Sequence, residues 1–238
     1  VVWVFFVLFC PLDSPTISNY NYSVIDYSVF IGGYMALRDH SLDEKITNAA
    51  FYEFYQKGFN GASLRKIAES AGVTVGAIQI RYKSKDELFA CLLKPLLDDI
   101  KTVFEDTKAD YFAESDADIL KKLEISMKNE AAAIIGLIFD HYEQAVLLLC
   151  RSAGSRLENC FDEIVRRKIS ESILFFKREN RLHIDEKLLG FLISVQFDGY
   201  RRVVTECSDR ETAERYMDAL MTYNLGGWNA LFAATDKK

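Results

Sequence analysis

The stretch from Ser63 to Lys85, SLRKIAESAGVTVGAIQIRYKSK, has the pattern of two short helices joined by a glycine turn and followed by a third helix. Ser63 is placed to cap the first helix, and apolar residues from Leu64 to Ala71 then recur at helical spacing on one face. Gly72 can adopt the left-handed conformation that ends this helix at little steric cost. The stretch therefore predicts a helix-turn-helix, a motif whose second helix lies in the major groove of DNA.

The second helix is expected to start at Val75, with Thr74 as its cap and Ile78 facing the core. The residues expected to point outward are Thr74, Val75, Gln79 and Arg81. Gln79 could read an adenine edge with both ends of its amide, and Arg81 could bind a phosphate or a guanine. Readout by Val75 would be limited to apolar contact with a thymine methyl group.

Further matching features extend this pattern over about fifty residues. They are an amphipathic helix over Ile46–Lys57, Gly58-Phe59, the Ile67-Ala68 pair, Ala71-Gly72-Val73, Gly76, Ser84-Lys85 and Leu88. This ordered set resembles the TetR family of bacterial transcription regulators. The resemblance implies an all-α fold with a DNA-binding head and a larger body that binds a small effector and forms a homodimer.

The resemblance also implies that Arg65 reaches a base and that Lys85 holds a phosphate. Ser63 and Tyr82 complete the expected DNA-binding residues. The family pattern carries two tyrosines at the positions of Gln79 and Arg81, so the contacts of those rings do not transfer to this chain.

The charge distribution favours the same function. Met35 to Lys85 holds eight Lys and Arg against five Asp and Glu, a net charge of +3, whereas the whole chain carries −6. A cationic head on an acidic body suits a protein that approaches phosphates with one end only. The alternative is a three-helix bundle with a purely structural role and a solvated surface.

The 238 residues are enough for a head and a separate body, and three prolines with half the residues apolar favour an all-helical chain. Capping boxes are expected at Ser41, Ser84, Ser155 and Ser208, with a weaker one at Ser115 and a further cap at Asp185. Helices after the head are expected over about 85–109, 116–138, 140–152, 156–179, 186–206 and 209–234. The predicted domains are a head over 35–84 and a helical effector-binding and dimerisation domain over 85–238.

Residues 1–34 do not fit this plan. Val1–Phe9 is apolar but shorter than the about 20 residues that span a bilayer. Because the first methionine is Met35, residues 1–34 are expected to be a non-native or disordered extension; the alternative is the end of a truncated membrane anchor.

The last helix is the expected site of dimerisation. The residues expected on its interface are Leu220, Tyr223, Asn224, Gly227 and Leu231. The Gly226-Gly227 pair costs about 1 kcal/mol per glycine within a helix, which is tolerable where two helices approach closely. Helix 186–206 is its expected partner within the chain, so that two chains would form a four-helix bundle. Packing of the glycines inside one chain is the alternative.

The effector site is less clearly marked. Its candidate residues are Phe104, Phe139, His141, Phe175 and Phe197, although aromatic residues at helical spacing commonly form the core. Pro95 interrupts the helix that links head and body, so it is a candidate hinge or a simple bend.

The sequence contains no catalytic triad order, phosphate loop, metal-ligand spacing or cofactor motif. We therefore expect a non-enzymatic, cytoplasmic regulator without metal or cofactor and with no membrane partner. Its expected partners are a palindromic DNA operator, a second copy of itself and an unknown small molecule. Repression is the family expectation. The alternative function is a helical small-molecule-binding protein or enzyme with a non-functional head.

Overall fold

The computed structural model describes residues 40–112, 119–178 and 184–235. All regular structure in these ranges is helical, so the predicted all-α fold is confirmed. The helices are α2 (His40–Gly61), α3 (Leu64–Ala71), α4 (Val75–Arg81), α5 (Lys85–Phe112), α6 (Ile119–Asp140), α7 (Tyr142–Cys150), α8 (Cys160–Arg178), α9 (Glu186–Glu206) and α10 (Arg210–Thr235). Residues 1–34 and Ser115 lie outside the described residues.

The described chain divides into two compact units. The head consists of the residues up to Leu93 together with Cys150–Glu158, and the body consists of Lys94–Leu149 and the residues from Asn159 onward. The head thus continues into α5 beyond residue 84 and includes a segment that follows α7. The chain passes between the units three times.

Three aromatic rings form the centre of the head. Phe54, Phe59 and Phe89 are buried, and their ring centroids are 4.9 to 6.0 Å apart. Gly58 has a φ of +67° and breaks the helical course of α2, in agreement with a first helix that ends at Lys57. The change of chain direction at Gly58 places the next residue, Phe59, in the ring cluster.

The helix caps were predicted only in part. Thr74 Oγ1 accepts from the Ala77 amide at 3.1 Å, and Asp185 accepts from the Leu188 amide at 3.0 Å, so both caps are confirmed. The Ser63 side chain makes no capping hydrogen bond, so that prediction is wrong. At the start of α10 the cap is Asp209 rather than Ser208, because Asp209 Oδ1 accepts from the Thr212 amide at 2.7 Å.

Two other expected capping boxes also differ. Ser41 lies inside α2, which begins one residue earlier. Ser155 accepts from the Leu157 amide at 3.1 Å and Glu158 from the Gly154 amide at 2.8 Å, but α8 begins only at Cys160. Ser84 does cap α5, since its Oγ accepts from the Glu87 amide at 3.1 Å.

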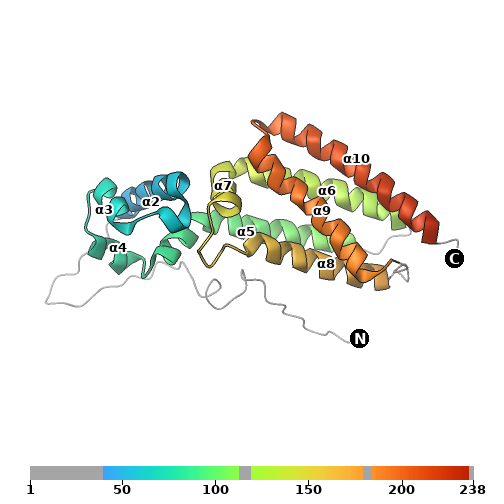
Figure 1. Ribbon diagram of the computed structural model, residues 1–238, viewed down its shortest axis with the longest axis horizontal. Helices are drawn as coiled ribbons and strands as arrows, with labels where there is room; N and C mark the ends of the chain where they lie inside the picture. Colours follow the sequence, from blue (N-terminus) through green and yellow to red (C-terminus); the bar gives the residue numbers. More distant parts are fainter. Residues whose placement is uncertain (1–39, 113–118, 179–183, 236–238) are drawn as a thin grey trace. The chain divides into compact units, whose positions relative to one another are not determined.

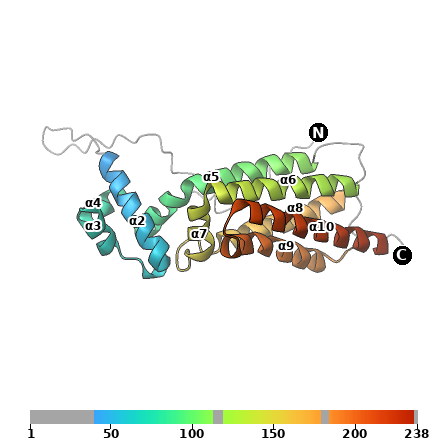
Figure 2. The same cartoon turned by 90° about the horizontal axis from the view of Figure 1, so that it is seen from above.

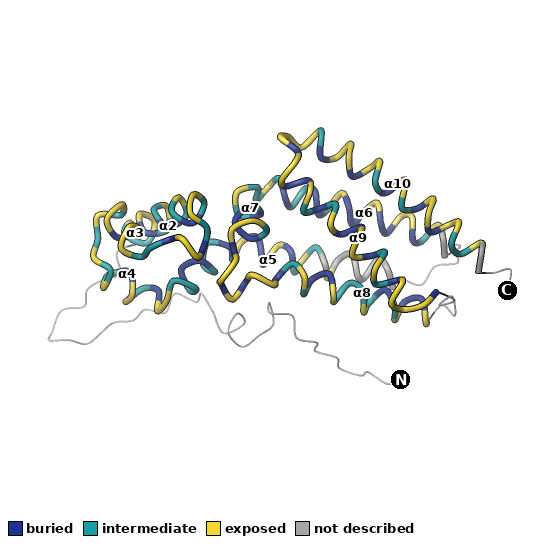
Figure 3. Tube along the Cα trace, viewed as in Figure 1, coloured by how far each residue is buried: buried dark blue, intermediate teal, exposed yellow. Residues whose placement is uncertain are grey.

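The body is a helical bundle. Helix α10 packs against α6 and α9, and α8 packs against α9 (Figures 1 and 2). Each helix turns one apolar side inward, as the alternation of buried and exposed turns along the trace shows (Figure 3). Among the described residues no single helix is long and apolar enough to cross a membrane; one bent pair, Lys121–Asp140 with Tyr142–Cys150, passes that test by length and composition only.

The head core should tolerate loss of an exposed ring but not of a buried one. Phe54→Ala should lower the free energy of unfolding by about 3–5 kcal/mol, because it removes a buried ring that contacts both Phe59 and Phe89. Tyr52→Ala, on the exposed side of the same helix, should change it by no more than about 0.5 kcal/mol. Chemical denaturation measures both, and equal losses would contradict this account of the core.

Candidate nucleic-acid interface

The turn between α3 and α4 fixes the rotation of α4. Gly72 has φ +68° and ψ +33°, and the amide of the next residue, Val73, donates to the Ala68 carbonyl at 2.9 Å. This is a glycine-terminated helix end in which the chain reverses within two residues. Helix α4 then starts at Val75 and buries Ile78 completely.

With Ile78 inward, the opposite side of α4 faces solvent. Gly76, Gln79 and Ile80 are exposed there, and Ile80 is 84% exposed. A methyl group built on Gly76 would meet no atom closer than 3.8 Å, so this part of the helix surface is low and open. We call Gly76, Gln79 and Ile80 the reading face.

Sequence reasoning missed Ile80 as a surface residue. Apolar residues are normally assigned to the core, and Ile80 is not among the residues predicted to point outward. The signal was available, because Ile80 is two positions from Ile78 and a helix rotates about 100° per residue. Once Ile78 faces inward, Ile80 must face outward.

Arg81 does not point outward as predicted. Its Nε donates to Asp43 Oδ1 of α2 at 2.8 Å, and both side chains are less than 20% exposed. Its Nη1 also donates to the Ala77 carbonyl at 3.4 Å. Arg81 therefore ties α4 to α2 and does not point freely outward, and its contact with a phosphate or guanine stays a prediction.

Lys85 also has partners inside the head. Its ammonium group donates to the carbonyls of Phe59 at 2.8 Å and Ala62 at 3.2 Å and lies 4.4 Å from the centroid of the Phe59 ring. Although Lys85 begins α5, its ammonium group lies at the end of α2, where it stabilises carbonyl groups that this helix leaves unpaired. Its phosphate contact stays a prediction, for which at most one ammonium hydrogen is left.

The other predicted DNA-binding residues differ in exposure. Arg65 and Thr74 are exposed, Ser63 and Val75 are half-buried, and Tyr82 is buried at the end of α4. Thr74 can still donate its hydroxyl hydrogen, because Oγ1 serves only as an acceptor for the Ala77 amide.

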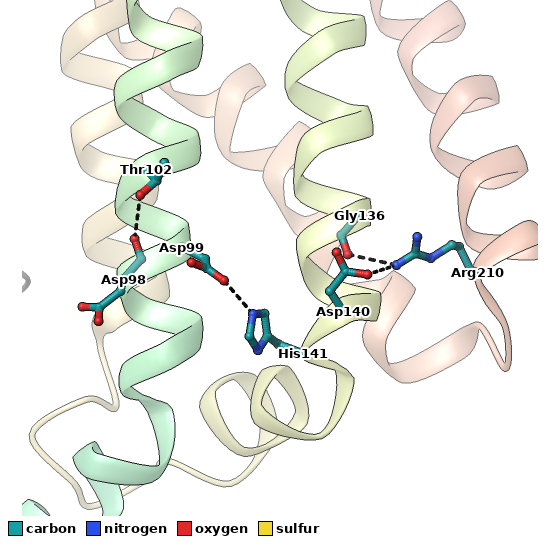
Figure 4. A network of polar contacts seen from close by, with 7 residues as sticks. All are labelled: Asp98, Asp99, Thr102, Gly136, Asp140, His141 and Arg210. Atoms are coloured by element: carbon teal, nitrogen blue, oxygen red, sulfur yellow. Dashed lines mark hydrogen bonds and ion pairs between the residues drawn. The ribbon is translucent and has the colours of Figure 1, made fainter.

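The predicted effector residues do not form one group. His141 Nε2 lies 2.8 Å from Asp99 Oδ2 of α5 (Figure 4), and Phe139, in the preceding turn of α6, stacks on Tyr142 with centroids 5.6 Å apart. The neighbouring Asp140 pairs with Arg210, which also donates to the Gly136 carbonyl at 3.2 Å. His141 thus joins α5 to the turn between α6 and α7.

The remaining candidates lie deeper in the bundle. Phe175 and Phe197 are buried, and each makes an edge contact with an aromatic neighbour on its own helix, Phe176 at 5.4 Å and Tyr200 at 5.4 Å. These contacts are those of core aromatic residues. The Phe104 side chain lies outside the described residues.

The predicted dimer face of α10 is partly open. Tyr223 is 79% exposed, Gly227 is exposed, and Leu220, Asn224 and Leu231 are half-buried. Methyl groups built on Gly226 and Gly227 would meet no atom of the described residues within 4 Å. The alternative, packing of these glycines within one chain, therefore finds no support among the described residues.

A helix-turn-helix head followed by a helical body is typical of DNA-binding transcriptional regulators. Residues 46–92 match the family described as bacterial regulatory proteins of the tetR family. The head therefore matches the model of this family, and the resemblance deduced from the sequence is confirmed.

Solved structures share the fold across both units. A TetR-like transcriptional regulator from Rhodococcus sp. RHA1 matches with a TM-score of 0.54 at 16% identity, over 81% of this chain and 100% of that chain. NalD, the secondary repressor of the MexAB-OprM multidrug efflux pump in Pseudomonas aeruginosa, matches with a TM-score of 0.51 at 20% identity, over 77% of this chain and 95% of that chain. FadR from Bacillus subtilis, in complex with stearoyl-CoA, matches with a TM-score of 0.50 at 17% identity, over 78% of this chain and 98% of that chain.

The Arg81–Asp43 pair should contribute to stability. Arg81→Ala should lower the free energy of unfolding by about 1–3 kcal/mol, because a half-buried carboxylate loses its charged donor. Gln79→Ala, on the exposed side of the same helix, should change the free energy of unfolding by no more than about 0.5 kcal/mol. A double-mutant cycle with Asp43→Ala measured by denaturant unfolding should show coupling between the two sites, and strict additivity would contradict the pairing.

Proposed function

We propose that this protein is a dimeric, sequence-specific DNA-binding regulator, a repressor that leaves its operator when a small molecule binds the body. The observation that carries the proposal is the reading face: Gln79 and Ile80 stand exposed beside an open Gly76 on the second helix of the motif. Ile80, which is 84% exposed, places an apolar group beside the Gln79 amide, a combination that can contact base edges.

The reading face has the chemistry for direct base readout. The Gln79 amide can pair with both the N6 and N7 positions of adenine, and Ile80 can contact a thymine methyl group. Gly76 lets the helix backbone come close to the floor of the groove because it carries no side chain there. Exposed Arg65 and Lys83 can bind the flanking phosphates.

The exposed apolar residues of α9 support a dimer. Leu188, Phe191 and Val195 follow one another at helical spacing on the outer side of α9, and Phe191 is 64% exposed. Helix α10 packs against α9 and presents Tyr223 and the open Gly227. A second copy of the chain could cover both helices at once and form the expected four-helix bundle.

Two segments could carry a signal from body to head. The boundary between the units lies at Leu93–Lys94 in α5, next to Pro95, which removes a hydrogen bond from the helix. The second segment follows α7 and is bound within the head, where the Phe59 amide donates to the Arg151 carbonyl at 2.8 Å. Movement of α5 or α7 in the body would therefore act on the head directly.

Two structures with the same fold support the proposed regulation. NalD is a repressor, and FadR was solved with stearoyl-CoA. Repression and the binding of a small molecule are thus each found in a protein with this fold. We carry over the mode of regulation but no particular ligand.

Base readout should depend on the reading face. On the duplex that the unaltered protein selects, Gln79→Ala should cost about 1–3 kcal/mol and remove the preference for one base pair in each half-site. Ile80→Ala should weaken discrimination of a thymine. Lys83→Ala should instead weaken binding to all sequences and reduce the salt dependence. Fluorescence anisotropy with singly substituted duplexes separates these effects, and an unchanged preference in both reading-face variants would contradict the assignment.

Dimerisation should depend on α9. Phe191→Asp places a charge in the proposed interface and should convert the dimer to a monomer in sedimentation experiments, with loss of binding to a palindromic duplex. Leu174→Asp is the matched control, because Leu174 is similarly exposed but lies on α8. A dimer that persists in Phe191→Asp, or that is lost equally in both variants, would contradict this interface.

A further inference from the structure

The core of the body contains an ion pair. Glu130 of α6 and Lys168 of α8 approach to 2.5 Å between Oε2 and Nζ, and the Glu130 side chain is only 5% exposed. Burying two charges is costly unless all of their remaining hydrogen-bonding positions are filled. Those of Glu130 are not.

Two buried oxygen atoms in this region are without a hydrogen-bond partner among the described residues. They are Glu130 Oε1 and the hydroxyl oxygen of Tyr200, which lies on α9 and is 2% exposed. Unpaired buried polar groups are rare in folded proteins because each costs free energy. Two in one region suggest a place where another molecule supplies the missing bonds.

The charge of Glu130 acts on the Tyr200 hydroxyl. Burial, and secondarily the charge of Glu130, raise the pKa of Tyr200 well above its ordinary value. The phenol therefore keeps its hydrogen at physiological pH and can both donate and accept a hydrogen bond. Glu130 Oε1 can only accept.

More polar side chains continue from this pair. Helices α6 and α8 run in opposite directions, and α9 runs parallel to α6 (Figures 1 and 2). Ser126, Ser172 and Gln196 are buried. Ser126 lies one turn before Glu130, Ser172 one turn after Lys168 and Gln196 one turn before Tyr200, so with these helix directions all three lie toward the same end of the bundle. The other buried neighbours one turn away are apolar, among them Met127, Ile134 and Phe197.

The charges limit the chemistry of a ligand. Lys168 already balances Glu130, so a cation would add an unpaired positive charge and an anion would face the carboxylate. A neutral hydroxyl group has the matching chemistry for both unpaired atoms, because it can donate to Glu130 Oε1 and accept from the Tyr200 hydroxyl. Apolar surroundings favour an apolar remainder.

We propose that Glu130 and Tyr200 form the recognition point for the effector, and that the effector is a neutral, largely apolar molecule with a hydroxyl group, such as a phenol or an alcohol. That the bound molecule is an effector rests on the proposed function, whereas its binding can be measured without DNA.

The first test uses the stability of the full-length protein without any ligand. Tyr200→Phe removes an unpaired buried hydroxyl and should raise the midpoint of thermal unfolding by about 2–4 °C. The control Tyr142→Phe removes a hydroxyl that donates to the Val204 carbonyl at 3.2 Å and should lower the midpoint. A lower midpoint in Tyr200→Phe would show that the hydroxyl is satisfied by protein or bound water, and would overturn the proposal.

The second test measures binding by equilibrium dialysis. The probes are naphthol and ethylphenol, each compared with naphthalene or ethylbenzene, which lack the hydroxyl, and with the naphthoate anion. The hydroxyl compounds should bind most tightly, and Tyr200→Phe and Glu130→Gln should each weaken them at least tenfold without affecting the two hydrocarbons. No saturable binding of the phenols, or equal binding by Tyr200→Phe, would overturn the proposal.

Failure of this proposal can be told apart from failure of the proposed function. Tyr200→Phe should bind DNA as the unaltered protein does, because Tyr200 lies in the body. Loss of phenol binding with intact DNA binding supports the recognition point. Phenol binding by a protein that binds no DNA sequence would retain the site and refute the regulator.

Discussion

The complete burial of Ile78 decides which side of α4 can meet DNA. The glycine turn at Gly72 brings α4 back across α3, and the Arg81–Asp43 pair joins the end of α4 to α2. A helix held at both ends and along one side cannot rotate. Gly76, Gln79 and Ile80 therefore remain exposed, and the proposed sequence readout depends on this rigidity.

The parts of the structure that depend on local pattern could be predicted from the sequence. The glycine turn, the Thr74 cap and the inward Ile78 follow from spacing and side-chain type. Contacts between distant parts of the chain could not. Arg81 pairs with a residue 38 positions earlier, and Lys85 reaches carbonyls at least 23 positions away, so both cations turn inward. The helix pattern for Arg81 and the family resemblance for Lys85 had indicated DNA contacts instead.

The body shows the same limit for buried polar groups. Glu130 and Tyr200 have no distinguishing local pattern, because a glutamate and a tyrosine on amphipathic helices are usually at the surface or in the core boundary. Only the packing of α6, α8 and α9 reveals that their oxygen atoms are buried and unpaired. A cost in stability at this point is what a site that waits for a ligand would show.

The most direct test of the central claim is selection of bound duplexes from a random library with the full-length protein at a stated salt concentration. The account predicts a palindrome whose half-sites are separated by one helical turn, about 34–36 Å, because two copies each present one reading face. Binding that depends on salt but enriches no sequence would contradict it, since phosphate contacts alone carry no base readout.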